Sequence, residues 1–444
     1  MNICVAGLWH LGSVTAACLA HAGNSVIGLD PDKENVERLG AGTPPIAEPG
    51  LAELIKEGLY SNRLSFTTDS SAALADAEVV WITYDTPVDA DDNADVEYVL
   101  DRVKELYAGL NDGTIVIISS QLPVGSTRVL EEALASEYPD KKVSFAASPE
   151  NLRLGKAISV FTNPDRVIVG VREGTKDNND KERIAKLLEP FTDNIVWMRV
   201  ESAEMTKHAI NSFLALSVTF ANEIATISEL SGADAKEVEK GLKSESRIGP
   251  GAYVAPGVAF AGGTLARDIS FLTSLGGELN LPVELLKAVR KSNNHHKLWV
   301  GTKLKSIIGD LSGKTIAVLG LTYKPGTDTL RRSSAVELCT ALTKAGAKVL
   351  ANDPAIKELP PELAAEFTLC SSPLEAMRGA AALVIATEWL DFKSITAEEV
   401  VTIMENPVVV DPNRFLAGTL SEARINYSAV GSPADASVTK GEPA

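Results

Sequence analysis

Short runs of apolar, often β-branched residues alternate with helix-like stretches in residues 1–200. The runs that resemble buried strands are residues 3–6, 25–29, 79–83, 114–119, 143–147 and 167–171. Runs of this length between turn signals are typical of strands that are covered on both faces. Their alternation with helices predicts a doubly wound, mostly parallel α/β sheet.

The pattern becomes helical in residues 201–305. Residues 202–242 have helical spacing with few turn signals before Ser231-Gly232, and a second helical stretch covers residues 268–304. We therefore expect a long central helical connector here.

A second strand-helix series follows the connector. Its apolar runs are residues 314–320, 349–353, 382–387 and 408–411. The expected fold is α/β, with two Rossmann-like doubly wound domains, residues 1–200 and 306–430, joined by the connector. Residues 431–444 are rich in Ser, Pro, Ala and charge, which predicts a disordered tail.

Composition narrows the function classes. A chain of 444 residues favours several domains, and a net charge of -17 argues against nucleic acid or an anionic membrane as partner. The four cysteines lie far apart without metal-ligand spacing, so we expect a reduced, cytoplasmic protein without a metal site. Residues 1–29 lack the positive leader of a secretory signal.

The first apolar run leads into a candidate dinucleotide turn, Gly7-Leu8-Trp9-His10-Leu11-Gly12, which opens a helix. Amides at a helix N-terminus can bind a pyrophosphate. Trp9 occupies the position where a glycine normally lets the backbone approach the phosphates. Asp30, 18 residues after Gly12, can bind both ribose hydroxyls and repel a 2′-phosphate, which favours NAD over NADP. A Rossmann scaffold whose turn binds no dinucleotide stays open as an alternative.

Six further segments agree in kind and order with one protein family. They are Glu48-Pro49-Gly50-Leu51, Thr86-Pro87, Leu122-Pro123-Val124-Gly125, Ser148-Pro149-Glu150-Asn151-Leu152, Tyr323-Lys324-Pro325-Gly326-Thr327-Asp328 and Thr387-Glu388-Trp389. From residue 1 to about 416 the chain resembles the UDP-glucose/GDP-mannose dehydrogenase family. The resemblance implies an NAD-dependent homodimer that oxidises the C6 alcohol of a nucleotide sugar to a carboxylate through an aldehyde held on a cysteine.

The resemblance also implies the catalytic residues. Lys207 and Asn211 match the family's catalytic lysine and asparagine, and their spacing places both on one helix face, where they can flank a developing oxyanion. Glu150 matches a site carboxylate. Residues 260–268 resemble the nucleophile loop, in which Asp268 is retained and Thr264 stands at the position of the cysteine.

Three departures from the family pattern fall in this presumed site. A threonine hydroxyl is a poor nucleophile without an adjacent base, so Thr264 should not capture the aldehyde. Gln121 replaces the usual threonine, and Leu154 replaces a second glutamate that helps to activate water. Without the cysteine thiol and the second glutamate, the chain lacks groups that the family uses for the second oxidation and the hydrolysis.

Other implied contacts concern the two ligands. The cofactor-binding residues are Gly7, Leu8, Trp9, His10, Leu11, Gly12, Asp30, Thr86, Gln121 and Arg331. The substrate-binding residues are Glu150, Asn151, Leu152, Arg153, Lys207, Asn211, Arg247, Phe260, Gly262, Tyr323 and Lys324. Arg247 resembles an arginine that the neighbouring subunit contributes in family dimers. Residues 249–257, rich in Gly, Pro and Ala, form a candidate loop over the sugar or a plain connector.

Two functions follow. The first is an NAD-dependent oxidoreductase acting on a UDP-hexose, which either reaches the acid without a thiol or stops after one oxidation. The alternative is a catalytically silent or regulatory nucleotide-sugar-binding protein, motivated by Trp9, Gln121, Leu154 and Thr264.

Overall fold

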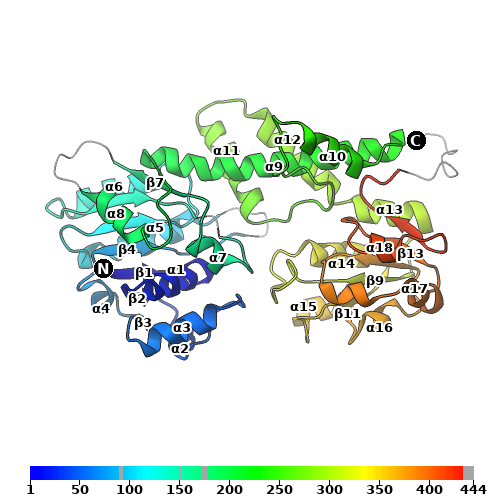
Figure 1. Cartoon of the computed structure of the whole chain (residues 1–444), viewed down its shortest axis with the longest axis horizontal. Coiled ribbons are helices and arrows are strands. Elements are labelled where there is room, and N and C mark those ends of the chain that lie inside the picture. The colour runs from blue at the N-terminus through cyan, green and yellow to red at the C-terminus, as the bar shows by residue number, and fades with distance from the viewer. Residues whose placement is uncertain (90–93, 151, 173–178, 434–444) are drawn as a thin grey trace. The chain divides into compact units, whose positions relative to one another are not determined.

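The computed structural model describes residues 1–89, 94–150, 152–172 and 179–433. The chain forms two compact units, Met1–Ile210 and Asn211–Ala444. Each unit contains a doubly wound sheet, and the long helix α9 (Val200–Ser231) begins in the first unit and ends in the second (Figure 1). The predicted fold class is confirmed, whereas the boundaries at residues 200, 305 and 430 stay predictions.

Strands and helices alternate in the first unit, as the apolar runs predict. Its strands are β1 (Asn2–Ala6), β2 (Ser25–Leu29), β3 (Leu64–Thr67), β4 (Val79–Ile82), β5 (Ile115–Ile118), β6 (Ser144–Ala147), β7 (Val167–Val171) and β8 (Ile195–Met198). Its helices before α9 are α1 (His10–His21), α2 (Lys33–Gly40), α3 (Leu51–Tyr60), α4 (Ser70–Leu74), α5 (Val96–Lys104), α6 (Ser126–Glu137), α7 (Ala157–Thr162) and α8 (Asp180–Leu188).

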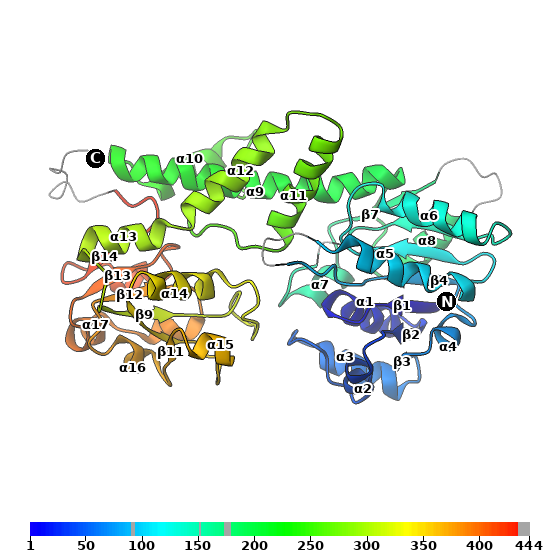
Figure 2. The ribbon, with the colours of Figure 1, turned by 180° about the vertical axis from the view of Figure 1, so that it is seen from behind.

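The first sheet has the order β3-β2-β1-β4-β5-β6-β7-β8, and only the β6–β7 pair is antiparallel among its described strands. Side chains alternate between two cores, so that α1, α3, α7 and α8 cover one face and α4, α5 and α6 the other (Figures 1 and 2). The strand order reverses between β1 and β4, which is where such sheets bind ligands.

The second unit contains a helical part and a smaller sheet. Its helices after α9 are α10 (Ala235–Ser244), α11 (Thr264–Glu278), α12 (Glu284–His296), α13 (Trp299–Ile308), α14 (Ser334–Lys344), α15 (Pro361–Ala364), α16 (Pro373–Met377), α17 (Ala397–Ile403) and α18 (Ala417–Leu420). Its strands are β9 (Thr315–Leu319), β10 (Lys348–Asn352), β11 (Thr368–Leu369), β12 (Ala382–Ile385), β13 (Val408–Val410) and β14 (Asn426–Ser428).

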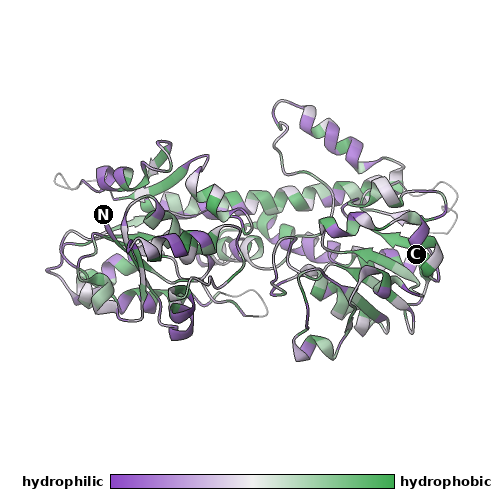
Figure 3. Cartoon of the chain, turned by 60° about the horizontal axis from the view of Figure 1, so that its bottom comes forward, coloured by the Kyte–Doolittle hydropathy of each residue, from purple (hydrophilic) through white to green (hydrophobic). Residues whose placement is uncertain are grey.

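The second sheet repeats the topology of the first. Its order is β11-β10-β9-β12-β13-β14, all parallel, which matches the order β3-β2-β1-β4-β5-β6 position by position. Helices α13 and α14 pack on one face and α16, α17 and α18 on the other. The strands of both sheets are predominantly apolar (Figure 3), as expected for sheets that are buried on both faces.

Helix α9 is long and apolar enough, by length and composition alone, to cross a membrane, and within the described ranges no other helix is. Of its most apolar window, 39% is buried inside the protein. Its buried polar residues include Glu204, His208, Asn222 and Glu229, and each is hydrogen-bonded to another part of the protein. A helix with protein partners for such groups is a core helix of the fold.

Candidate active site

The first turn joins β1 to α1 at the point where the strand order reverses. Gly7 has φ 94°, and a Cβ atom there would lie 2.5 Å from the backbone nitrogen of Tyr84. A Cβ atom at Gly12 would clash with the carbonyl oxygen of Gly7. Both glycines therefore allow α1 to pack closely on the sheet. The first amides of α1 lack helical partners, which suits a diphosphate.

Trp9 stands where the middle glycine of the fingerprint is expected. It is the N-cap residue of α1, with φ −71° and ψ −153°, so its backbone is extended and does not need glycine. The residue is 43% exposed, so its indole belongs to the surface of the unit and not to the core. The substitution thus preserves the turn but adds a large ring at the helix N-terminus.

Asp30 follows β2 and lies beside this turn, as predicted. Its Oδ2 accepts a hydrogen bond from the Leu8 nitrogen at 2.6 Å, and its Oδ1 accepts one from the Asp32 nitrogen at 2.9 Å. Burial raises the pKa of Asp30, although these backbone hydrogen bonds oppose the shift. The structure therefore holds the Asp30 carboxyl group directly beside the first turn.

Two other predicted cofactor residues meet at the same edge of the sheet. The Thr86 hydroxyl donates to the carbonyl oxygen of Gln121 at 2.7 Å, which joins the segment after β4 to the segment after β5. Leu8 is buried in the core below the turn. The structure thus brings together residues that lie far apart in the sequence.

Glu48 connects the first turn to the segment after residue 154. It is buried, and its carboxylate accepts hydrogen bonds from the backbone nitrogens of Gly155 at 2.7 Å and Ala157 at 2.8 Å. The Nε2 atom of His10 lies 2.9 Å from the same carboxylate. The sequence marked residues 48–51 only as a family segment, without a role for the glutamate.

Glu150 and Lys207 are neighbours in the first unit. The Lys207 ammonium donates to the carbonyl oxygen of Glu150, and the Glu150 carboxylate accepts from the nitrogen of Leu152. Both residues, with Gln121, line a cavity of about 30 Å³, enough for roughly one water molecule. Lysine, carboxylate and space for water are the components of acid/base chemistry.

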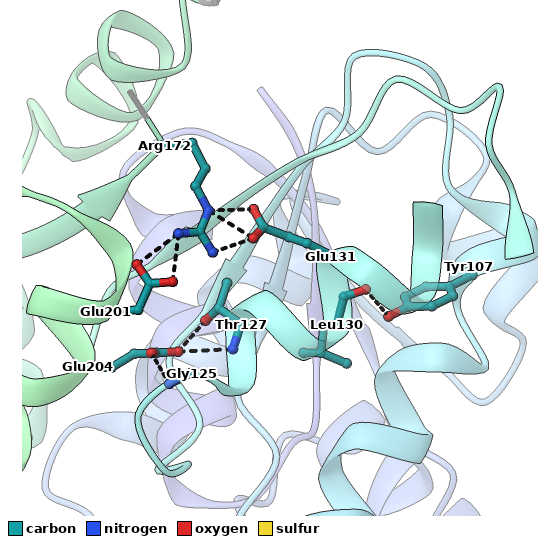
Figure 4. A network of polar contacts seen from close by, with 8 residues as sticks. All are labelled: Tyr107, Gly125, Thr127, Leu130, Glu131, Arg172, Glu201 and Glu204. Atoms are coloured by element: carbon teal, nitrogen blue, oxygen red, sulfur yellow. Dashed lines mark hydrogen bonds and ion pairs between the residues drawn. The ribbon is translucent and has the colours of Figure 1, made fainter. Parts of the chain in front are cut away.

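Three carboxylates, of which Glu204 is buried, join the start of α9 to α6 and to Arg172 after β7 (Figure 4). Glu204 accepts hydrogen bonds from the nitrogens of Gly125 and Thr127 at the N-terminus of α6 and from the Thr127 hydroxyl. Arg172 pairs with Glu131 of α6 and Glu201 of α9. Glu204 precedes Lys207 by one helical turn, so this network positions the lysine. No local sequence pattern indicates this network.

Asn211 and Asp268 are joined in the second unit, where the Asn211 side-chain amide donates to the Asp268 carboxylate. Asp268 is 0% exposed and lies on α11, one turn after Thr264. Gly263, the N-cap of α11, has φ 96° and ψ −125°, a conformation that favours glycine. Thr264 is exposed as the first residue of the helix.

A larger cavity of about 830 Å³ opens in the second unit near the carboxyl ends of β9 and β12. Phe260 and Tyr323, two predicted substrate residues, line it together with Thr322 and Thr387. Gly320 has φ 91°, and a Cβ atom there would lie 2.5 Å from the Thr387 nitrogen, the arrangement found at Gly7. A cavity of this size and place suits a small nucleotide.

The remaining predicted site residues that the structure describes lie in segments between helices and strands. Gly262 precedes the N-cap of α11, and Lys324 follows Tyr323 in the turn after β9. Arg247 and Arg331 are exposed, and Arg247 pairs with Glu245 at 3.0 Å. The remaining positions are near Glu150: Leu152 and Leu154 are half-buried, Arg153 is exposed, and Asn151 lies outside the described residues.

Burial disfavours the thiolate form of all four cysteines. Cys4, Cys18, Cys339 and Cys370 are all buried and free. Burial raises the pKa of Cys4 and of Cys18 to about 12, and it raises the pKa of the other two as well. The structure therefore supplies no substitute for a nucleophilic thiol.

Comparison with known proteins covers almost the whole chain. Family models match at residues 1–192 (UDP-glucose/GDP-mannose dehydrogenase family, NAD binding domain), 201–295 (central domain) and 317–418 (UDP binding domain). The chain is 35% identical to a UDP-glucose 6-dehydrogenase of Pseudomonas aeruginosa, with 98% of each protein covered. It is 34% identical to that of Rhizobium meliloti, with 98% of the chain and 100% of the relative covered.

Solved structures agree with these matches. A UDP-glucose dehydrogenase from Pyrobaculum islandicum superposes with a TM-score of 0.87 at 31% identity, covering 97% of this chain and 98% of that one. A UDP-D-MAnNAc dehydrogenase from Pyrococcus horikoshii gives 0.84 at 25% identity, with 97% and 99% covered. With its NAD-binding and UDP-binding domains, the chain belongs to the UDP-glucose/GDP-mannose dehydrogenase family of NAD-dependent oxidoreductases.

Proposed function

We propose that this protein oxidises the C6 alcohol of a UDP-hexose, with Lys207 and Asn211 flanking the reacting oxygen. The observation that carries the proposal is the placement of both residues on α9, four positions apart and therefore on one face. Lys207 is held by the Glu150 carbonyl and Asn211 by Asp268. Both donors are thus oriented before a ligand binds, as stabilisation of a developing oxyanion requires.

The ligand assignments use the matched domains. NAD, when bound, accepts hydride from the alcohol carbon; Gly7, Gly12, Asp30, Thr86 and Gln121 are the residues that would hold it at the first turn. The uridine diphosphate would occupy the 830 Å³ cavity of the second unit, against Phe260 and Tyr323. Lys324, Arg247 and Arg331 are proposed to neutralise phosphate charge, since paired phosphates favour Arg and Lys partners.

Chemistry beyond the first oxidation differs from the family's usual route. Thr264 has no thiol, and the four cysteines are buried with raised pKa values. An aldehyde formed at C6 therefore adds water and is oxidised as its hydrate, or it is released. The hydrated route requires a group that takes a proton from water, and Glu150 beside the small cavity is our candidate.

We also propose that two copies associate through α9. Phe213, Phe220 and Ile227 are exposed large apolar residues at seven-residue spacing, and Leu230 continues their stripe. A heptad stripe of this kind is typical of helices that pair with another helix. Arg247, with its exposed side chain, would then be available to a neighbouring copy.

The test is a panel of UDP-hexoses and GDP-hexoses incubated with NAD and followed by product mass and NADH count. A UDP-hexose should be consumed in preference to its GDP counterpart. Two NADH and a uronic acid per sugar indicate the hydrated route, and one NADH with an aldehyde indicates release. Binding of the UDP-sugar without any NADH would contradict the enzyme and support the silent alternative.

Thr264→Cys is the matched variant for the missing thiol. If its absence limits the second step, the variant should raise the ratio of acid to aldehyde among the products. Thr273→Cys, on the same helix, controls for the addition of a thiol. An unchanged ratio in Thr264→Cys would show that residue 264 does not decide the depth of oxidation.

A further inference from the structure

Residues 257–260 form an irregular segment whose backbone is bound by side chains. Asn222 of α9 accepts from the Gly257 nitrogen at 3.0 Å and donates to the Val258 carbonyl at 3.3 Å. Asn293 of α12 accepts from the Phe260 nitrogen and donates to the Phe260 carbonyl, both at 2.9 Å. Each side-chain amide thus makes hydrogen bonds that a neighbouring strand would otherwise make with this backbone.

A third amide reaches the segment from the second sheet. Asn413, after β13, accepts from the Val258 nitrogen at 2.9 Å. A Cβ atom at Gly257 would meet the Asn413 side-chain oxygen, so the lack of a side chain at this position leaves room for the approach of Asn413.

His296 completes the set of contacts. Its Nε2 atom lies 2.8 Å from the Gly257 carbonyl oxygen, on the same helix as Asn293. Asn222 and Asn293 are almost fully buried, so their hydrogen bonds do not compete freely with water. Side chains from α9, α12 and the turn after β13 therefore converge on four residues of irregular backbone.

The anchored segment forms one wall of the 830 Å³ cavity. Gly257, Val258, Ala259 and Phe260 all line it, and Tyr323 belongs to the same lining. The segment continues directly into Gly262, Gly263 and Thr264. Its position therefore sets both the width of the cavity and the start of α11.

We propose that Asn222, Asn293 and Asn413 are positioning residues for the nucleotide sugar. This inference rests on the proposed function of the cavity as the uridine diphosphate site. The amides hold residues 257–260 in the binding geometry before the ligand arrives, so the ligand does not have to order the segment. They act through the segment and do not need to touch the ligand.

Asn293→Ala and Asn413→Ala test the proposal, with calorimetric titration of UDP alone and separate KM values for sugar and NAD. A net loss equivalent to one hydrogen bond corresponds to a rise of about tenfold in Kd. We expect such a rise in the Kd for UDP and in the sugar KM, with the NAD KM unchanged. Asn24→Ala is the matched control, because Asn24 is a buried amide that donates to the Leu19 carbonyl in the first unit.

UDP binding by the parent tests the assignment of the cavity, and UDP binding by the variants tests the role of the amides. If the parent binds no UDP, the cavity assignment fails. If the parent binds UDP and both variants bind it equally well, the amides are only structural and the inference is overturned. Should a variant fail to fold, hydrogen exchange of the unliganded parent decides. The amides of Gly257, Val258 and Phe260 must exchange more slowly than those of Tyr253, Val254 and Ala255, which precede the segment, and equal exchange contradicts the proposal.

Discussion

The Nε2 atom of His10 lies 2.9 Å from the carboxylate of Glu48, which also binds the nitrogens of Gly155 and Ala157. One buried carboxylate thus holds the first residue of α1 and the start of α7. The first belongs to the candidate dinucleotide turn, and the second follows the segment that contains Glu150. The relationship couples the two predicted ligand regions of the first unit.

Glu48→Ala should therefore weaken both ligands. It leaves the buried Ala157 amide and the half-buried Gly155 amide without their acceptor, and a buried donor without a partner costs about 1–3 kcal/mol of unfolding free energy. We expect a lower melting temperature and higher KM values for NAD and for the sugar. Glu53→Ala, at an exposed position of α3, is the control. A variant with the parent's KM values would show that the coupling is not functional.

Trp9→Gly restores the middle glycine of the turn. If the indole crowds the diphosphate, the variant should bind NAD about tenfold more tightly, which corresponds to about 1.4 kcal/mol. Titration calorimetry measures the change, with Trp389→Phe as a control for the loss of a tryptophan away from this turn. Equal or weaker binding would indicate that Trp9 takes part in holding the cofactor.

As the pH is lowered, the affinity for NAD should begin to fall at a higher pH than it would if Asp30 had the pKa of an ordinary aspartate. Burial raises the pKa of Asp30 above its usual 3.8. As the pH falls through the raised pKa, the carboxylate takes up a proton and accepts ribose hydrogen bonds less well. Asp30→Asn should bind NAD weakly without this pH dependence and discriminate less against NADP. An identical pH profile in parent and variant would contradict the role of Asp30.

The Arg172 network should stabilise the first unit above acidic pH. Burial alone would raise the pKa of Glu201, but the hydrogen bond from Arg172, a backbone hydrogen bond and the charges of Arg172 and Arg128 together outweigh it and lower the pKa below its usual 4.5. A carboxyl with a depressed folded pKa stabilises the protein above its unfolded pKa, and the stability is lost as the pH falls through the folded pKa. Arg172→Met should reduce the fall in melting temperature between neutral and acidic pH. An unchanged dependence of the melting temperature on pH would contradict this role of Arg172.

Phe220→Glu tests the association of α9. A charge in the middle of the exposed apolar stripe should convert dimers to monomers, as measured by sedimentation. Tyr60→Glu places the same charge at another exposed aromatic residue, on α3, and should leave the mass unchanged. A monomeric parent would refute the proposed dimer directly.

Local patterns predicted much of the fold. Runs such as residues 25–29 and 167–171 coincide with β2 and β7, because strands buried on both faces have continuous apolar sequences. The edge strands β3, β8, β11 and β14 were not predicted, since they are short and mostly exposed or half-buried. The antiparallel β6–β7 pair depends on long-range pairing that no local pattern encodes.

The candidate site, like the fold, could be predicted only in part from the sequence. The proposed roles of Gly7, Gly12 and Asp30 follow from spacing within one strand-turn-helix unit, and the structure shows the close packing that requires the glycines. Glu48, Glu204 and the amides of Asn222, Asn293 and Asn413 were missed, because each binds backbone that is distant in the sequence. Glu48 and Ala157, for instance, lie 109 residues apart.

The most direct measurement is NADH formation by the purified protein with NAD and a UDP-hexose, compared with that of Lys207→Ala. The proposed function predicts that NADH appears with the sugar, is absent without it, and falls by about a hundredfold or more in the variant, on the scale of acid/base or oxyanion groups. A parent that binds the UDP-hexose and NAD but forms no NADH, or a variant as fast as the parent, would contradict it.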